Sequence, residues 1–331
     1  MKMSAALTIR VVTSLEEFKG LAREWEELLD RVPGHSLFLT WEWLYYWATH
    51  HLEDGQLRIL LASDEHECLV GIAPLYLRRT KAQGLISVRE LRWLGSEAVC
   101  SSYLDFIVQE RHKPALLQRL YRYLFNEARG EWDMLTLSDV PAESPTLDLW
   151  NELFAEAGKV GEVVRMTSCP VVRLPRDVGS YRAGLGRNRR YTLQRKTKCL
   201  AEAGRVHFTR ATNPADVEAA FESVVALHQQ RWSPRPGGGV FADERAKRFH
   251  RDIVRVLSER GRASLDLLLL DGRPIAGGEE ADGADGEREE TRAKGDTASS
   301  GHASKVSAGL RSGAQRTLKA SPGPRDEHGR W

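Results

Sequence analysis

Three side chains near one another in the sequence, His228, Arg231 and Trp232, have the chemistry to act on a polar substrate. An imidazole accepts a proton near neutral pH, and a guanidinium holds an anion through paired hydrogen bonds. A helical pattern ends here, before the glycine-rich stretch Ser233–Gly239, and helix C-termini favour His and Arg for electrostatic reasons alone. We predict His228 as a catalytic base and Arg231 and Trp232 as substrate-binding residues; stabilisation of the helix end is the alternative.

A second candidate pair, Tyr103 and Asp105, lies two residues apart in the run Tyr103–Val108, which reads as a strand. Alternate residues of a strand share a face, and Asp is disfavoured in strands unless it has a reason to be there. We predict Asp105 as catalytic and Tyr103 as substrate-binding, with a structural hydrogen-bonded pair as the alternative. Trp43, in the aromatic helix Trp41–His50, is a further substrate-binding candidate, and core packing is its alternative role.

A strongly basic segment, predicted as the helix Tyr181–Ala203, carries six cations in the twelve residues from Arg187. At 100° per residue these cations encircle the helix. They predict attraction of a phosphorylated or other anionic ligand, with Arg187 and Arg190 as the residues that contact it. The alternative is a solvated helix. Nucleic-acid binding is disfavoured, because the net charge is only +2 and Tyr191 is the only interleaved aromatic side chain.

The elements that position these residues alternate between strand and helix patterns, which predicts an α/β or mixed α+β fold. The chain has 331 residues, 41% of them hydrophobic, which is enough for two ordinary domains with a sizeable core. Two cycles of similar element order predict two related lobes, over residues 1–165 and 166–278. The predicted strands include Leu7–Val12, Leu57–Ser63, Cys68–Arg78, Arg89–Leu94, Trp132–Ser138, Arg205–Ala211 and Ala263–Leu270, and Asp271-Gly272 predicts a tight hairpin turn.

Composition also indicates where the protein works and what it lacks. The four cysteines are scattered and none forms a CxxC pair, so neither a zinc site nor a disulfide framework is predicted, and we expect no metal. No segment reaches the roughly 18 apolar residues of a spanning helix. The segment Met1–Thr8 is too short and too weakly apolar for a signal peptide. We therefore expect a cytoplasmic protein without a transmembrane segment.

The pattern of the sequence changes abruptly at Gly278. Residues 279–331 contain only four large apolar side chains and no visible helical or strand period, so we predict a disordered tail. A native flexible tail is one interpretation. The other is a change of reading frame near Gly278, because the sequence is in the middle of a predicted hairpin there and then loses all pattern.

The order of several motifs resembles the GNAT-type acyltransferase superfamily, more narrowly its CelD-like group associated with cellulose and exopolysaccharide biosynthesis, and more distantly the two-lobed FemABX peptidyltransferases. The resemblance covers roughly residues 8–278 and does not extend into the tail. The motifs are TWEWLYYW, LVGIAPLYLRR and SSYLDFIV in the first lobe, and RNRRYTLQRKTKCL, LHQQRW, VFADERAKRFH and LDLLLLDGRPIAG in the second.

This resemblance implies two tandem GNAT-like lobes and transfer of an acyl group from an acyl-CoA donor, such as acetyl-CoA, to an amine or hydroxyl. The implied acceptor is a small molecule or glycan precursor derived from a sugar or an amino acid. In such folds the donor lies between two splayed strands, with its pyrophosphate on the backbone N–H groups of a helix N-terminus. Arg187 and Arg190 become the candidate donor-binding residues.

The sequence departs from this pattern in both lobes. In the first lobe, the stretch Gln109–Pro114, where the phosphate loop is expected, contains no glycine. In the second lobe, the strand and phosphate helix expected just after Ile275 are missing, so this lobe reads as incomplete. The alternatives to an enzyme are an inactive truncated remnant, or a non-catalytic protein that binds an anionic ligand.

Overall fold

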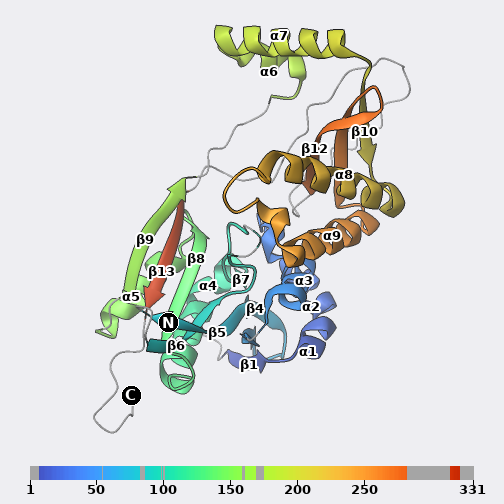
Figure 1. The fold of residues 1–331 in the computed structure, drawn as a ribbon. Helices are drawn as coiled ribbons and strands as arrows, with labels where there is room; N and C mark the ends of the chain where they lie inside the picture. Colours follow the sequence, from blue (N-terminus) through green and yellow to red (C-terminus); the bar gives the residue numbers. More distant parts are fainter. Residues whose placement is uncertain are drawn as a thin grey trace. The chain divides into compact units, whose positions relative to one another are not determined.

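The computed structural model describes residues 7–53, 55–82, 86–97, 99, 101–158, 161–168, 175–281 and 314–320 (Figure 1). The fold is mixed α/β, as the sequence predicts. The chain divides into two compact units. Of the described residues, the first unit holds those up to Ser168 together with Ala314–Ala320, and the second holds residues 175–281. A boundary between residues 165 and 166 would cut the strand Gly161–Ser168, so the predicted boundary moves to the end of that strand.

The first unit opens with a strand followed by short helices and a 3₁₀ turn, Leu37–Leu39. The hydroxyl of Ser14 accepts a hydrogen bond from the backbone N–H of Glu17 at 3.2 Å and so caps the first helix. The helical segment that follows is divided at Leu21 into two helices. These elements are β1 (Thr8–Val12), α1 (Leu15–Gly20), α2 (Ala22–Leu29) and α3 (Trp41–His51).

Two sheets form the frame of the first unit. The four-stranded sheet has the order β1-β3-β4-β7 and the six-stranded sheet has the order β2-β5-β6-β8-β13-β9. All pairs are antiparallel except β6 and β8, which run parallel with Arg92 opposite Thr136. The bounds are β2 (Gln56–Leu57), β3 (Ile59–Ser63), β4 (Leu69–Ala73), β5 (Leu75–Ala82), β6 (Ile86–Trp93), β7 (Ile107–Val108), β8 (Met134–Pro141), β9 (Gly161–Ser168) and β13 (Ala314–Ala320).

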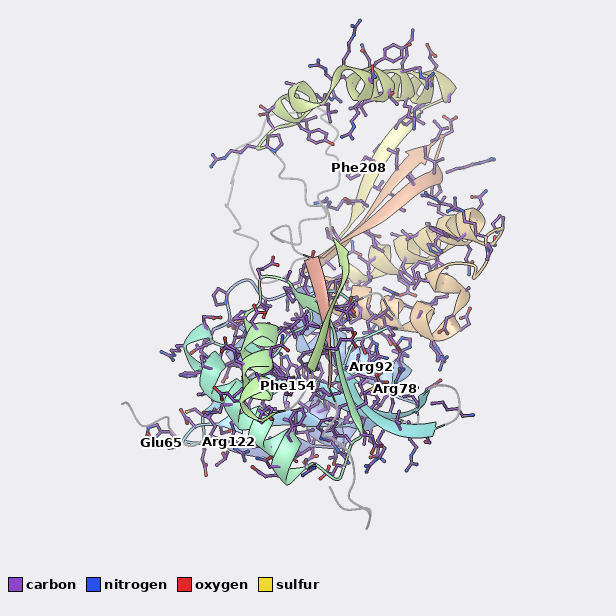
Figure 2. All side chains as sticks on the ribbon, turned by 90° about the vertical axis from the view of Figure 1, so that its left-hand side faces the viewer. Glu65, Arg78, Arg92, Arg122, Phe154 and Phe208 are labelled. Carbon is purple, nitrogen blue, oxygen red and sulfur yellow. The ribbon has the colours of Figure 1, made fainter. Side chains whose placement is uncertain are left out.

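The largest fully buried side chains of the first unit are aromatic. Helices α4 (Lys113–Arg122) and α5 (Thr146–Glu156) and a π-helical turn, Tyr123–Glu127, supply several of them. Phe154 of α5 lies among the buried side chains of this unit (Figure 2), and its ring contacts Trp150 edge-on at a centroid distance of 5.9 Å. Burying such large apolar surfaces supplies most of the stabilisation of a core of this kind.

The segment after Gly278 departs from the predicted disorder at two places. Strand β12 (Arg273–Ala281) continues past Gly278 and pairs with β11 (Ala263–Leu270) along its whole length. Strand β13 lies between β8 and β9 and pairs antiparallel with both. A central strand is held by backbone hydrogen bonds on both edges, so it can form without the alternating apolar pattern from which we predict strands. Residues 282–313 and 321–331 lie outside the described residues.

The second unit contains a three-stranded antiparallel sheet, β10-β11-β12, with two helices packed on it. The turn between β11 and β12 is the predicted Asp271-Gly272, with φ values of +48° and +79°, as a two-residue hairpin turn requires. The elements of this unit are α6 (Val178–Gly184), α7 (Arg187–Ala203), β10 (Val206–Ala211), α8 (Pro214–Trp232) and α9 (Glu244–Glu259), with a 3₁₀ turn at Val240–Ala242.

The same order of elements occurs in both units. In the first unit the order is strand β1, helices α1 and α2, a 3₁₀ turn, helix α3 and, after the two-residue strand β2, the hairpin β3–β4. In the second unit it is strand β10, helix α8, a 3₁₀ turn, helix α9 and the hairpin β11–β12. In each unit the residue after the 3₁₀ turn, Thr40 or Asp243, caps the next helix through its side chain. The capping residue is therefore part of the recurring pattern.

Candidate functional site

The predicted base His228 lies near the end of α8 in a small group of rings. Its imidazole stacks on Trp232 at a centroid distance of 5.9 Å and meets Phe241 edge-on at 4.8 Å. The Nδ1 atom is buried and has no hydrogen-bond partner among the described residues. Because buried polar atoms are normally paired, an unpaired imidazole nitrogen is a candidate contact for a substrate or for water.

The glycine-rich loop after α8 packs against this imidazole. Gly237, Gly238 and Gly239 have φ values of +85°, +64° and +79°, which residues other than glycine rarely adopt. A Cβ atom on Gly239 would lie 2.3 Å from Cε1 of His228. The loop therefore needs glycine at residue 239, both for its backbone conformation and for the close approach to the ring.

Burial and a neighbouring charge both favour the uncharged form of the His228 ring. Burial lowers the pKa of His228 below its ordinary value, and the positive charge of Arg231 lowers this pKa further. A neutral imidazole can accept a proton, as the predicted role requires. The guanidinium of Arg235, which the sequence did not single out, lies 4.5 Å from the centre of the Trp232 ring, a cation–π distance. His228, Arg231 and Trp232 thus lie together near the end of α8.

Removing the neighbouring charge should raise the pKa of His228. We expect Arg231→Gln to raise it, while Arg273→Gln, the same charge change at the start of β12, leaves it in place; NMR titration of the imidazole measures both. Because the pKa of His228 is lower in the folded state, His228 makes its full contribution to stability above the unfolded pKa of about 6.5. This contribution is lost as the pH falls through the pKa of the folded state. An unchanged titration in Arg231→Gln would contradict the electrostatic part of this account.

Asp105 is the centre of a buried polar cluster in the first unit. One carboxylate oxygen, Oδ2, accepts hydrogen bonds from Ser144 Oγ at 2.5 Å and from Lys113 Nζ at 3.2 Å. The other oxygen, Oδ1, accepts from Thr146 Oγ1 and from the backbone N–H of Phe106, each at 2.7 Å. The carboxylate is therefore fully satisfied by the protein itself, as a structural ion pair would be.

The predicted strand Tyr103–Val108 is shorter in the structure, where only Ile107–Val108 is a strand. Tyr103 has a φ of +57°, so the pair does not have the alternating strand geometry from which a shared face was predicted. Trp43 is 4% exposed, and its indole N–H donates to Ser101 Oγ at 2.9 Å. Such burial is that of a core residue, the alternative role for Trp43.

The basic helix α7 has no buried residue. Arg187 and Arg190 are both exposed, and Arg190 donates to the backbone carbonyl of Ala183 at 3.3 Å. Tyr191 of the same helix is 65% exposed. Exposed cations on every side of a helix suit a long-range attraction of anions better than a formed pocket.

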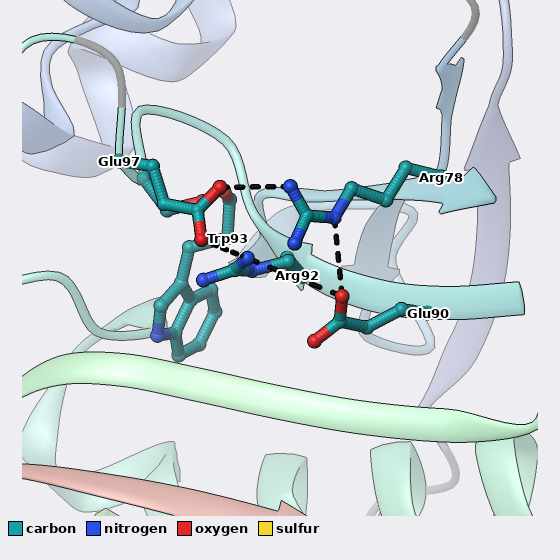
Figure 3. A network of polar contacts seen from close by, with 6 residues as sticks. Arg78, Glu90, Arg92, Trp93 and Glu97 are labelled. Carbon is teal, nitrogen blue, oxygen red and sulfur yellow. Dashed lines mark hydrogen bonds and ion pairs between the residues drawn. The ribbon is translucent and has the colours of Figure 1, made fainter. Parts of the chain in front are cut away.

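The first unit also contains a network of two arginines and two glutamates that was not predicted from the sequence (Figure 3). Arg78 of β5 donates to Glu90 Oε2 at 3.1 Å and to Glu97 Oε2 at 2.7 Å, and Arg92 of β6 forms a hydrogen bond with Glu97. Burial acts to raise the pKa of Glu97, but Arg92 and Arg78 outweigh burial and lower it. The sequence signal that could have revealed this network is the pair of charged residues Glu90 and Arg92, which alternate with apolar residues in a predicted strand.

The residues that the structure describes contain no group of His, Cys, Asp and Glu side chains arranged to hold a metal ion. No helix in the described part of the chain is long and apolar enough to cross a membrane.

Comparison with known proteins gives one family match. Residues 187–278 match the model of the acetyltransferase (GNAT) domain, an interval that runs from the start of α7 into β12. No match was found among the curated proteins. The family match therefore covers the described helices and strands of the second unit from α7 onward, including His228, Arg231 and Trp232.

Several solved structures are similar to parts of this chain. A conserved protein of unknown function from Bacteroides thetaiotaomicron VPI-5482 has 10% identity and a TM-score of 0.43, covering 83% of this chain and 75% of that one. A putative phosphinothricin N-acetyltransferase has 13% identity and a TM-score of 0.29, covering 49% and 86%. Spermidine N-acetyltransferase from Vibrio cholerae, in complex with CoA and spermine, has 15% identity and a TM-score of 0.26, covering 49% and 83%.

Proposed function

We propose that this protein transfers an acyl group from an acyl-CoA donor, such as acetyl-CoA, to an amine or hydroxyl. The observation that carries the proposal is the coincidence of two features in one unit. The acetyltransferase (GNAT) match covers residues 187–278, and the same interval contains a partly buried imidazole with an unpaired nitrogen. A family match gives the class of reaction, and the unpaired base gives a group that can carry its proton transfer.

In the proposed reaction, neutral His228 takes the proton from the acceptor as the acceptor nitrogen or oxygen attacks the thioester carbonyl. The C–S bond breaks, the acyl group stays on the acceptor, and the CoA thiolate leaves and is protonated. Arg231 has two roles in this proposal: it keeps the imidazole neutral and it holds an anionic part of the substrate. Trp232 supplies an aromatic wall beside the base.

The acceptor class is a proposal that rests on side-chain chemistry. Trp232 with Arg235 and Arg231 offers an aromatic face and two cations, which suits a sugar- or amino-acid-derived acceptor carrying an anionic group. The motif order supports a CelD-like or FemABX-like subtype and a role in exopolysaccharide biosynthesis in the cytoplasm, as part of the same proposal. The exposed cations Arg187 and Arg190 would attract the phosphates of the donor.

The rate of thioester cleavage with and without His228 tests the proposal. We expect the full chain to release CoA from acetyl-CoA in the presence of an amino-sugar or amino-acid acceptor. His228→Asn should slow this release by roughly 10²–10⁴-fold, the usual contribution of a general base. His207→Asn, a substitution of an exposed histidine on β10, is the matched control and should leave the rate unchanged. Equal rates in wild type and His228→Asn would remove His228 from the mechanism.

The second candidate function is that of a non-catalytic protein that binds an anionic ligand elsewhere, and an observation against donor binding in the first unit favours it. Helix α4 begins at Lys113 without a side-chain cap, at the place where the resemblance puts the donor pyrophosphate. The ammonium of Lys113 is already paired with the Asp105 carboxylate. A donor phosphate would have to replace this internal anion, so we propose that the first unit does not bind the donor at α4.

The other alternative to an enzyme, an inactive truncated remnant, concerns the segment after Gly278. It proposes that a change of reading frame near Gly278 has replaced the part that would grip the donor. Resequencing the gene across codon 278 and comparing the activity of the chain in the two frames separates this alternative from a native tail. Acyl transfer by the present chain would exclude an inactive remnant, whichever reading frame is native.

A further inference from the structure

A groove in the first unit is lined by four arginines, one of which is Arg78 of the network described above. Its volume is about 400 Å³, and its polar lining includes Gln56, Arg58, Arg79, Arg89 and Glu131. Arg79 of β5 and Arg89 of β6 are direct cross-strand partners. Arg78 also lines the groove, but its guanidinium is already paired with Glu90 and Glu97.

Two like charges directly opposite each other weaken a β-sheet unless something neutralises them. The charge of Arg89 is neutralised by Asp133, whose carboxylate accepts from Nε at 3.0 Å and from Nη2 at 2.9 Å. Arg79 is exposed, and among the described residues it has no hydrogen bond or ion pair. The groove therefore retains one uncompensated positive charge, directly opposite a second guanidinium.

The guanidinium groups of Arg58 and Arg89 are held in place by the protein. The Nη1 atom of Arg89 donates to the carbonyl of Gly130 at 2.7 Å, in addition to its bonds with Asp133. Arg58 donates to the carbonyl of Leu57 at 3.1 Å and to Gln56 Oε1 at 3.4 Å, and its Nε lies 3.6 Å from Glu131 Oε2. Each guanidinium has five N–H groups, so each keeps N–H donors beyond those used here.

We propose that this groove binds the phosphate group of a small phosphomonoester, held by Arg79 together with the fixed guanidinium groups of Arg89 and Arg58. Arginine recognises phosphate through two parallel N–H···O bonds, and fixed donors lose little entropy on binding. The groove is larger than a phosphate ion needs, which leaves room for the carbon part of an ester beside the apolar side chain of Leu77. The proposal is independent of acyl transfer, since none of these residues belongs to the His228 site.

Calorimetric titration of the full chain with sn-glycerol 3-phosphate and with inorganic phosphate tests the proposal. We expect both probes to bind the wild type, the ester more tightly than inorganic phosphate. Arg79→Gln should weaken binding of the ester by roughly ten-fold or more, which corresponds to the loss of about one charge-assisted contact. Arg122→Gln, an equal charge change at an exposed residue of α4, is the matched control and should change the affinity little.

Three outcomes would overturn the proposal: no binding of either probe at millimolar concentrations, equal losses in Arg79→Gln and Arg122→Gln, or inorganic phosphate binding as tightly as the ester. The thermal unfolding of each variant without ligand is measured in parallel. Arg79→Gln removes one of two opposed cations from an exposed position, so it should unfold at the wild-type temperature or above it. A loss of affinity in a normally folded variant then reports on the groove itself.

Discussion

Asp105→Ala should lower the free energy of unfolding of the first unit by about 3–5 kcal/mol, the usual cost of leaving one member of a buried ion pair without its partner. Lys113 is 7% exposed, and its ammonium would lose its only carboxylate contact among the described residues. The hydroxyls of Ser144 and Thr146 would lose their acceptor at the same time. Chemical denaturation followed by tryptophan fluorescence measures the change, because this unit contains buried tryptophans such as Trp93.

The double variant Asp105→Ala/Lys113→Met is the control for this prediction. Replacing both members of a buried pair by apolar groups is much less costly than removing one, so the double variant should regain much of the lost stability. If Asp105→Ala loses less than about 1 kcal/mol, the Asp105 cluster does not stabilise the fold. A catalytic role for Asp105 would then become the better reading of its burial.

Leu318→Pro should destabilise the six-stranded sheet by roughly 2 kcal/mol or more and promote aggregation. Leu318 lies in β13, opposite Leu137 of β8 on one side and Val163 of β9 on the other. Proline has no backbone N–H to give to either neighbour and is not tolerated in the middle of a sheet. Strand β9 pairs with β13 alone among the described strands, so loss of β13 leaves the edges of β8 and β9 open to other chains.

Leu318→Val is the matched control for the proline variant, because valine keeps the backbone N–H and favours strands. Urea denaturation and light scattering of the two variants give the comparison. Equal stability of both variants would show that β13 contributes nothing to the sheet. Residues after Gly278 would then be dispensable for the first unit, which would favour the flexible-tail or altered-frame interpretations of this segment.

The sequence predicted best those elements that are specified locally. The aromatic helix begins at Trp41 as predicted, with Thr40 as its cap, and the Asp271-Gly272 turn is in place. These features depend on neighbouring residues, so their patterns are visible in a short window of sequence. The mixed α/β class followed from their alternation along the chain.

The sequence failed where distant residues decide the structure. The segment around Tyr103 and Asp105 looks extended and apolar, but Asp105 is held by Lys113 and Thr146, which come from later parts of the chain. Strand β13 is specified by the open edges of β8 and β9 rather than by its own composition. The arginine groove likewise depends on the register that places Arg79 opposite Arg89, which the hairpin sequence alone does not fix.

The candidate site lies between these cases. The spacing of His228, Arg231 and Trp232 placed them on one helix end, and the structure adds contacts around the His228 ring that the sequence did not show. The approach of Gly239 to the ring and the unpaired Nδ1 atom come from a loop that folds back onto its own helix. Such an approach requires glycine at a positive φ, which three consecutive glycines in the sequence permit but do not demand.

Mass spectrometry of the acceptor after incubation with acetyl-CoA tests the proposed acyl transfer most directly. The full chain is incubated with acetyl-CoA and a mixture of amino sugars and amino acids, beside His228→Asn and His207→Asn. The account predicts an acceptor that gains one acetyl group with the wild type and with His207→Asn, and far less of this product with His228→Asn. Intact acetyl-CoA and no acetylated acceptor with folded wild-type protein would contradict it and leave anion binding as the better account.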